Sequence, residues 1–226
     1  MKTSTQTSAN PIHTGPRLEE TLWVATATGK DREKIYQVRH DIYAGELGQH
    51  PTNDARILRD PLDMGNVYLV VKSGGELVGF VSITLPTQSS YSIDKYFCRQ
   101  DLPFAIDDTL FEIRLLTVLK PHRGREIASL LMYAAFRWIE SHGGKSVVAI
   151  GRREILNLYL RAGLKRAGRS TRCGLVSYDL LYATVQGIRE QVQSFSGLLV
   201  RLREKTRWDL NFPFSQPAGC FHGVAG

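Results

Sequence analysis

The stretch from Phe111 to Leu131, FEIRLLTVLKPHRGREIASLL, decides how the rest of the chain is interpreted. It begins with an apolar segment, 111–119, that is typical of a β-strand, and it continues through a basic turn at 120–125. From 127 onward apolar residues recur every three or four positions, which predicts a helix with one buried face. A strand that leads through a basic turn into a helix presents free backbone N–H groups and the positive end of the helix dipole to an anion. The stretch therefore indicates either an anion-binding turn or an ordinary crossover with solvated arginines.

The length and composition are those of a globular protein with one good-sized α/β domain, or with one domain and appendages. The chain has 226 residues, of which 42% are hydrophobic and 23% charged. No apolar run approaches the roughly 20 residues that cross a bilayer, and the N-terminal segment lacks the apolar core of a secretory signal. The three cysteines are far apart and have no CxxC spacing. We therefore expect a cytoplasmic protein with no membrane segment and no bound metal.

The chain carries a net charge of +7, with 29 basic and 22 acidic residues. This excess suits a polyanionic partner such as a phosphorylated donor, an acidic carrier protein or RNA, and we expect no DNA partner. The excess is concentrated between Arg152 and Arg172, where Glu154 is the single acid. A tRNA could bind this basic cluster, and a solvated basic face is the alternative.

The predicted order of elements is β, α, β, β, β, α, β, α, β, followed by a C-terminal helix. The strands are expected at 22–27, 67–73, 76–86, 111–119, 145–151 and 175–184. The helices are expected at 31–47, from the basic turn to 142, at about 153–162, and from 185 onward. This order predicts an α/β fold with a mixed sheet and helices on its faces.

Three regions follow from this order. Residues 1–17 are predicted to form a flexible arm, and 18–184 a single domain. Residues 185–226 are predicted to form a helix and tail that pack on the domain or form a dimer contact, so that the chain is a monomer or a homodimer.

Three segments resemble the GCN5-related N-acetyltransferase (GNAT) superfamily. RLLTVLKPHRGREIASLLM (114–132) is similar to the family's strand, acyl-donor loop and helix, although Glu126 stands where the family has a glycine. NLYLRAGLKRAG (157–168) is similar to a second family motif in its Tyr159 and Gly163, and 67–86 is similar to the central hairpin. The resemblance implies the GNAT fold and an acyltransferase activity.

A second resemblance is to the autoinducer-synthase branch of this fold and its N-acyl amino acid synthase relatives. The segments QVRHDIYAGELG (37–48), RDPLD (59–63) and YSIDKYF (91–97) carry it. Members of that branch take acyl groups from acyl carrier protein. Ser82 occupies the place where the branch carries an arginine, so the resemblance implies the general design and not the product.

These resemblances imply roles for particular residues. Glu112 is the candidate base, with a bridge to Arg114 as its alternative, and Tyr159 is the candidate acid, with simple packing as its alternative. The backbone amide of Val118 is the expected oxyanion donor. The implied donor-binding residues are Leu116, Val118, Arg123, Gly124, Arg125, Ala128 and Asn157, and the implied acceptor-binding residues are Arg39, Tyr43 and Glu46.

The implied reaction moves an acyl group from a carrier-borne thioester to a small amine or amino acid in biosynthesis, with no permanently bound cofactor. If Glu126 points inward, its carboxylate repels the pyrophosphate of coenzyme A, which favours a phosphopantetheine arm on acyl carrier protein. The alternatives are acetyl-CoA or aminoacyl-tRNA as the donor and, in another class, a non-catalytic binding module.

Overall fold

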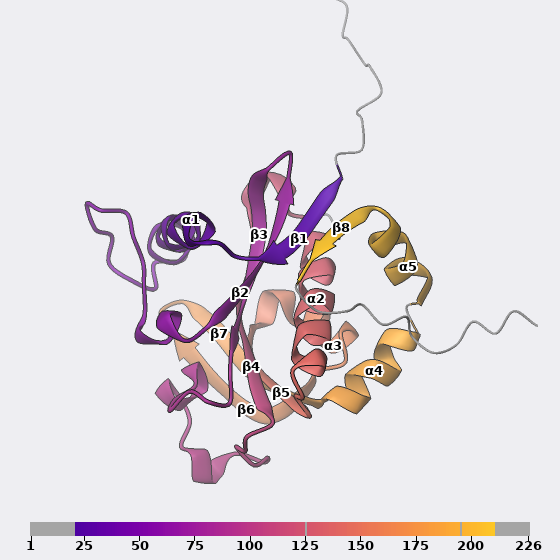
Figure 1. The fold of residues 1–226 in the computed structure, drawn as a ribbon. Coiled ribbons are helices and arrows are strands. Elements are labelled where there is room, and N and C mark those ends of the chain that lie inside the picture. The colour runs from indigo at the N-terminus through magenta and orange to yellow at the C-terminus, as the bar shows by residue number, and fades with distance from the viewer. Residues whose placement is uncertain (1–20, 125, 195, 211–226) are drawn as a thin grey trace, which may run out of the picture.

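The computed structural model describes residues 21–124, 126–194 and 196–210, which form an eight-stranded sheet flanked by helices (Figure 1). The strand order is β6-β7-β5-β4-β3-β2-β1-β8. The strands are β1 (Leu22–Thr26), β2 (Val67–Ser73), β3 (Glu76–Thr84), β4 (Leu110–Val118), β5 (Ser146–Arg152), β6 (Lys165–Cys173), β7 (Val176–Thr184) and β8 (Thr206–Asp209). The helices are α1 (Gly29–Arg39), α2 (Ile127–Ser141), α3 (Leu156–Arg161), α4 (Val185–Gln193) and α5 (Ser196–Glu204). The sheet is mixed, because β4–β5 and β1–β8 are parallel pairs and the others are antiparallel.

Each face of the sheet has its own apolar core. Helix α2 covers one face together with α4 and α5, and α1 covers the other (Figure 1). Leu130, Leu131 and Ala134 of α2 are fully buried against the sheet, as the three-and-four spacing predicts. On the opposite face, Ile35 of α1 packs with Tyr68 and other residues of β2 and β3. The predicted α/β fold, a mixed sheet flanked by helices with an additional C-terminal helical segment, is confirmed.

Two strands were not predicted from the sequence. Strand β6 lies at the edge of the sheet and most of its side chains are exposed, so it lacks the apolar alternation that identifies a half-buried strand. Strand β8 has only four residues and pairs in parallel with β1 at the other edge. Strand β6 was missed because it lacks an apolar pattern, and β8 because it is short and pairs with a strand that is distant in the sequence.

The first and the last predicted helices differ in detail from the helices in the structure. The helix expected over 31–47 is α-helical only to Arg39 and continues as a π-helix from His40 to Glu46. The C-terminal helix is divided into α4 and α5. The predicted arm at 1–17 and the tail from 211 to 226 lie outside the described residues.

Candidate active site

The parallel strands β4 and β5 separate part-way along their length. Their pairing runs from Leu110 opposite Ser146 to Ile113 opposite Ala149. Beyond this point β4 continues to Val118 and β5 to Arg152, and the two strands no longer pair with each other. This divergence, called the splay below, leaves backbone groups on the facing edges of the two strands without sheet partners.

A bulge in β4 accompanies the splay. Arg114 pairs with Ser82 of β3 and Thr117 pairs with Phe80, so two residues of β4 oppose one of β3. Leu115 adopts a φ of +56°, which costs about 1–2 kcal/mol for a residue with a β-carbon. The surrounding pairs hold this strained conformation in place.

The bulge and the pairing fix the direction of the Val118 amide. Leu119 donates its N–H to the Val78 carbonyl on β3 at 2.9 Å. Because successive N–H groups of a strand face opposite edges, the Val118 N–H faces the edge that β5 has left. The Val118 carbonyl faces the same edge and accepts a hydrogen bond from the Arg123 side chain at 3.2 Å. This is the orientation that the predicted oxyanion donor requires.

A cavity of about 410 Å³, the loop cavity, lies between the π-helix, the end of β4 and the turn that follows it. Five of the seven predicted donor-binding residues line it, namely Leu116, Val118, Arg123, Gly124 and Ala128. Arg125 lies outside the described residues, and Asn157 is exposed on α3 and does not line the cavity. Glu46, which the resemblance assigned to the acceptor, lines this cavity instead.

Two charged residues stand at the loop cavity's turn. Arg123 bridges the cavity, since its guanidinium pairs with the Glu46 carboxylate at 3.1 Å while it also bonds to the Val118 carbonyl. Glu126 immediately precedes α2, is exposed and does not line the loop cavity. The repulsion expected of an inward-pointing Glu126 therefore has no geometric support.

A second cavity of about 220 Å³, the inner cavity, lies on the other side of the splay. It is bounded by the π-helix, the loops after it, the bulge of β4 and the ends of β5 and β7. Four residues line both cavities, namely Tyr43, Leu116, Arg152 and Ile155. The two cavities thus meet at the splay.

Buried ion pairs form one wall of the inner cavity. Arg39, which is 3% exposed, contacts both oxygens of the Asp63 carboxylate at 2.7 and 2.8 Å. Arg114 bonds to the Asp60 carboxylate beside it. Burial raises the pKa of Asp60, but the positive charge of Arg114 and its hydrogen bond outweigh this and hold the pKa below its usual value. Both the Asp60 and the Asp63 carboxylate are therefore held in ion pairs that form the cavity wall.

Glu112 is fully buried on β4, behind the inner cavity. Its carboxylate accepts hydrogen bonds from the Ser92 hydroxyl, the Ser92 N–H at 2.8 Å and the Ile93 N–H at 3.1 Å. Burial raises the pKa of Glu112, although the Arg114 charge and these hydrogen bonds act in the opposite direction. Ser92 itself lines the inner cavity, so its hydroxyl connects Glu112 to the space beyond. Sequence reasoning did not identify Ser92, although it lies in the quoted segment 91–97.

Tyr159 and Tyr178 line the inner cavity near Arg152. Burial raises the pKa of Tyr159 well above its usual range, so its hydroxyl remains protonated at neutral pH. Burial likewise raises the pKa of Tyr178 to about 12, and its hydroxyl accepts a hydrogen bond from the Gln49 amide at 2.5 Å. Gln49 and Tyr178 were not identified from the sequence, because their proximity depends on the pairing of β5 with β7 and on the loop after the π-helix.

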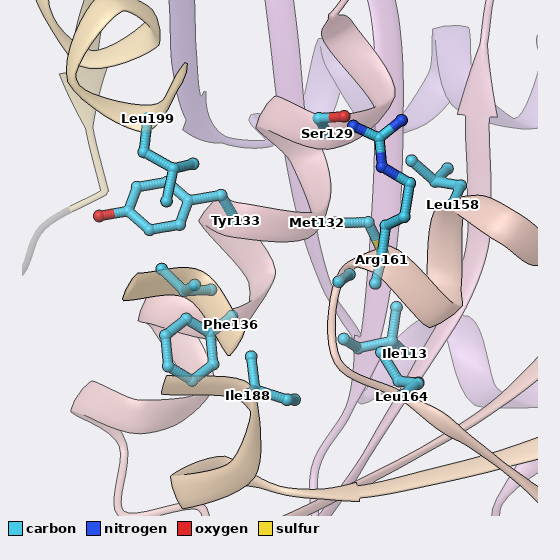
Figure 2. Close-up of a pocket in the computed structure, with 12 residues that line it drawn as sticks. Ile113, Ser129, Met132, Tyr133, Phe136, Leu158, Arg161, Leu164, Ile188 and Leu199 are labelled. Atoms are coloured by element: carbon cyan, nitrogen blue, oxygen red, sulfur yellow. The ribbon is translucent and has the colours of Figure 1, made fainter. Parts of the chain in front are cut away.

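An apolar pocket of about 90 Å³ lies on the α2 face of the sheet (Figure 2). Figure 2 shows Ser129 and the Arg161 guanidinium together on one side, with apolar side chains of α2, α4 and α5 around the rest. Leu158 lines both this pocket and the loop cavity, so the two lie side by side. Ile113, the last β4 residue that pairs with β5, lies at its inner end.

Part of the basic cluster from Arg152 to Arg172 is neutralised by ion pairs. Arg153 and Arg166 both pair with the Asp179 carboxylate at 3.3 Å. Arg152 lines the two cavities. Among the described residues, no helix combines the length and the apolar composition needed to cross a membrane.

Comparison with known proteins identifies the same architecture. The sequence model of the acetyltransferase (GNAT) family matches residues 32–164, which is more than half of the chain. No curated protein sequence matches the chain.

Solved structures of the same fold include members of the branch named above. A CoA-dependent acyl-homoserine lactone synthase, BjaI, solved with SAM and isopentyl-CoA, is 17% identical with a TM-score of 0.67 over 87% of this chain and 95% of that one. The acyl-homoserine lactone synthase LasI is 16% identical with a TM-score of 0.59, over 73% of this chain and 89% of that one. FeeM, an N-acyl amino acid synthase from uncultured soil microbes, is 12% identical with a TM-score of 0.58, over 76% of this chain and 95% of that one. At these identities the likeness shows the fold, and the fold likeness to this branch agrees with the resemblance read from the sequence.

Proposed function

The chain belongs to the acetyltransferase (GNAT) family and is an acyltransferase, and from this premise we propose that it moves an acyl group from a phosphopantetheine thioester to a small amine or amino acid. The observation that carries this proposal is the meeting of two cavities at the splay. The loop cavity accepts the donor arm, and the inner cavity accepts the amine. An acyl carbon held at the splay is then open to attack from the second cavity.

Transfer follows from the groups at this junction. The amine nitrogen attacks the thioester carbonyl, and the oxygen that gains negative charge accepts a hydrogen bond from the Val118 N–H. Glu112 takes the proton from the amine through the Ser92 hydroxyl, which donates to Glu112 as it accepts from the amine. The C–N bond forms, the C–S bond breaks, and Tyr159 donates its proton to the departing thiolate.

The apolar pocket supports an acyl group longer than acetyl. It adjoins the loop cavity at Leu158, and its walls are mainly carbon atoms of α2, α4 and α5. Burying each methylene there contributes about 0.8 kcal/mol to binding. The Arg161 and Ser129 polar groups lie on one side only, so an alkyl chain fits the remainder (Figure 2).

We favour acyl carrier protein as the donor, because the chain has a net charge of +7. Carrier proteins are acidic, and such a partner is steered by positive charge. Coenzyme A is the second candidate, because Glu126 does not line the loop cavity and two solved proteins of this fold, BjaI and MesI, are described as CoA-dependent. Aminoacyl-tRNA is less favoured, because the pairing of Arg153 and Arg166 with Asp179 removes two cations from the surface that a tRNA would use. The presence of both cavities does not favour a non-catalytic module.

Turnover assays distinguish these donors. Octanoyl-carrier protein, octanoyl-CoA and a charged tRNA are each mixed with the chain and a set of free amino acids and amines, and thiol release and product mass are measured. We expect amine-dependent release from the carrier thioester at a higher kcat/KM than from octanoyl-CoA. Equal or better use of octanoyl-CoA would overturn the carrier preference, and no N-acyl product from any donor would overturn the proposed function.

A further inference from the structure

The inner cavity has an excess of positive charge. The cationic side chains that line it are Arg39, Arg59, Lys95, Arg114 and Arg152, and Asp60 is the only carboxylate among the described residues of the lining. The buried carboxylates of Asp63 and Glu112 stand behind the wall. Even with these included, the cations outnumber the carboxylates, so the cavity favours an anionic ligand.

Most of these cations are already neutralised or solvated. Arg39 and Arg114 are buried and paired, as described above. Lys95 is exposed and lies 4.0 Å from Asp60. Arg59 is exposed and lies over the Tyr36 ring, 4.8 Å from its centroid. These four residues therefore have either a partner or access to water.

Arg152 is different. It is half-buried, and within the described part of the chain its guanidinium makes no hydrogen bond and no ion pair. It is the last residue of β5, beyond the point where β4 has separated, and it lines both cavities. Its charge acts on the hydroxyls of Tyr159 and Tyr178, which places it among the polar groups of the inner cavity. Removing a guanidinium from water without a partner is costly, so a ligand anion at this point offsets that cost.

Resting on the proposed function, we propose that Arg152 is a specificity-determining residue that binds a carboxylate of the acceptor, and that the acceptor is consequently an amino acid rather than a simple amine. A guanidinium holds a carboxylate with two parallel hydrogen bonds, and partial burial strengthens them. In an α-amino acid one carbon separates the amine from the carboxylate. A carboxylate held by Arg152 at the junction therefore keeps the amine next to the splay, where the acyl carbon is held.

The test compares acids with amines of the same side chain. The pairs are tyrosine with tyramine, phenylalanine with phenethylamine, and leucine with isopentylamine, each assayed with the octanoyl thioester that the chain uses best. We expect the wild-type chain to prefer the acid of at least one pair by about 10- to 100-fold in kcat/KM, the contribution of a charge-assisted hydrogen bond. We expect Arg152→Gln to remove this preference while the KM for the thioester stays within about twofold.

Arg153→Gln is the matched control. Arg153 is the next residue in the chain, is exposed, pairs with Asp179 and lines neither cavity. This variant should keep the full preference for the acid. A wild-type chain without such a preference, or an Arg152→Gln variant that retains it, would overturn the inference. Loss of thioester binding in Arg152→Gln would also overturn it, by assigning Arg152 to the donor. If the donor assay gives no N-acyl product at all, the proposed function fails and this inference fails with it.

Discussion

The inner cavity and the loop cavity share four side chains but are built in different ways. The inner cavity's wall consists of buried ion pairs, with Arg39 bonded to Asp63 and Arg114 bonded to Asp60. The loop cavity consists of the strand end, a turn and a helix start, and its one ion pair among the described residues, Arg123 with Glu46, is exposed. Binding a donor arm that many acyltransferases share requires little more than hydrogen bonds to the protein backbone. Recognition of a particular amine needs side chains fixed in one arrangement, which the buried pairs supply.

Breaking a buried pair should have the largest effect. In Arg39→Met the Asp63 carboxylate remains buried without its guanidinium partner, and we expect the free energy of unfolding to fall by about 3–5 kcal/mol. Urea denaturation measures this loss. The matched control is Arg56→Met, because Arg56 pairs with Asp41 at 2.8 Å on the surface and should contribute less than about 1 kcal/mol. Equal losses in the two variants would contradict the distinction between the cavities.

The second test concerns the base behind the inner cavity. Glu112→Gln keeps an oxygen for the Ser92 hydroxyl but cannot take a proton, so we expect kcat to fall about 100-fold with KM values little changed. Burial raises the pKa of Glu112, and the active form is the carboxylate. The wild-type kcat should therefore increase as the pH rises through this pKa, and Glu112→Gln should lack that increase. A variant with the wild-type profile would show that Glu112 only anchors the Ser92 loop.

The third test disturbs the strand on the loop cavity's side. A β-carbon at Gly79 would lie 2.9 Å from the Thr117 carbonyl oxygen and 3.1 Å from the Leu131 side chain. Gly79→Ala should therefore push β4 or α2 away and destabilise the fold by about 1–3 kcal/mol. Gly29→Ala, at the start of α1, meets nothing within 4 Å and should be neutral or slightly stabilising. Thermal unfolding measures the stability of both variants. Equal melting temperatures would contradict the close contact of Gly79 with β4 and α2.

The smallest effect is expected from the exposed pair. Glu46→Gln removes the partner of Arg123, and both side chains are more than 40% exposed. The free energy of unfolding should change by less than about 1 kcal/mol, and less still at high salt. Urea denaturation at two salt concentrations measures this. A loss as large as that of Arg39→Met would mean that the loop cavity also depends on an ion pair.

The same contrast explains how much could be predicted from the sequence. The strand, turn and helix of 111–131 form a local unit, so periodicity and the family motif located the loop cavity and most of its predicted residues. Residues of the inner cavity come from distant elements. Ser92 meets Glu112 because an irregular loop folds back on β4, and Tyr178 meets Gln49 only because β7 pairs with β5. No local pattern encodes such contacts.

Two residues lie elsewhere than the sequence predicted, because local patterns do not encode long-range geometry. Glu46 lines the loop cavity rather than the inner one, because the π-helix carries its last turn toward Arg123. Glu126 occupies the position of the family's glycine in the sequence, but its side chain is exposed at the start of α2. The direction of a single side chain depends on the backbone conformation around it, which sequence similarity to a motif does not specify.

The most direct test of the central claim, direct transfer between two cavities that meet at the splay, is the amine dependence of thiol release. The chain is mixed rapidly with its octanoyl thioester, with and without an amino acid acceptor, and free thiol is followed over the first turnover. Direct transfer predicts no thiol release without the acceptor, and release matched by N-acyl product when the acceptor is present. A burst of thiol equal to the enzyme concentration in the absence of acceptor would mean that the acyl group first transfers to the protein, and it would contradict the account.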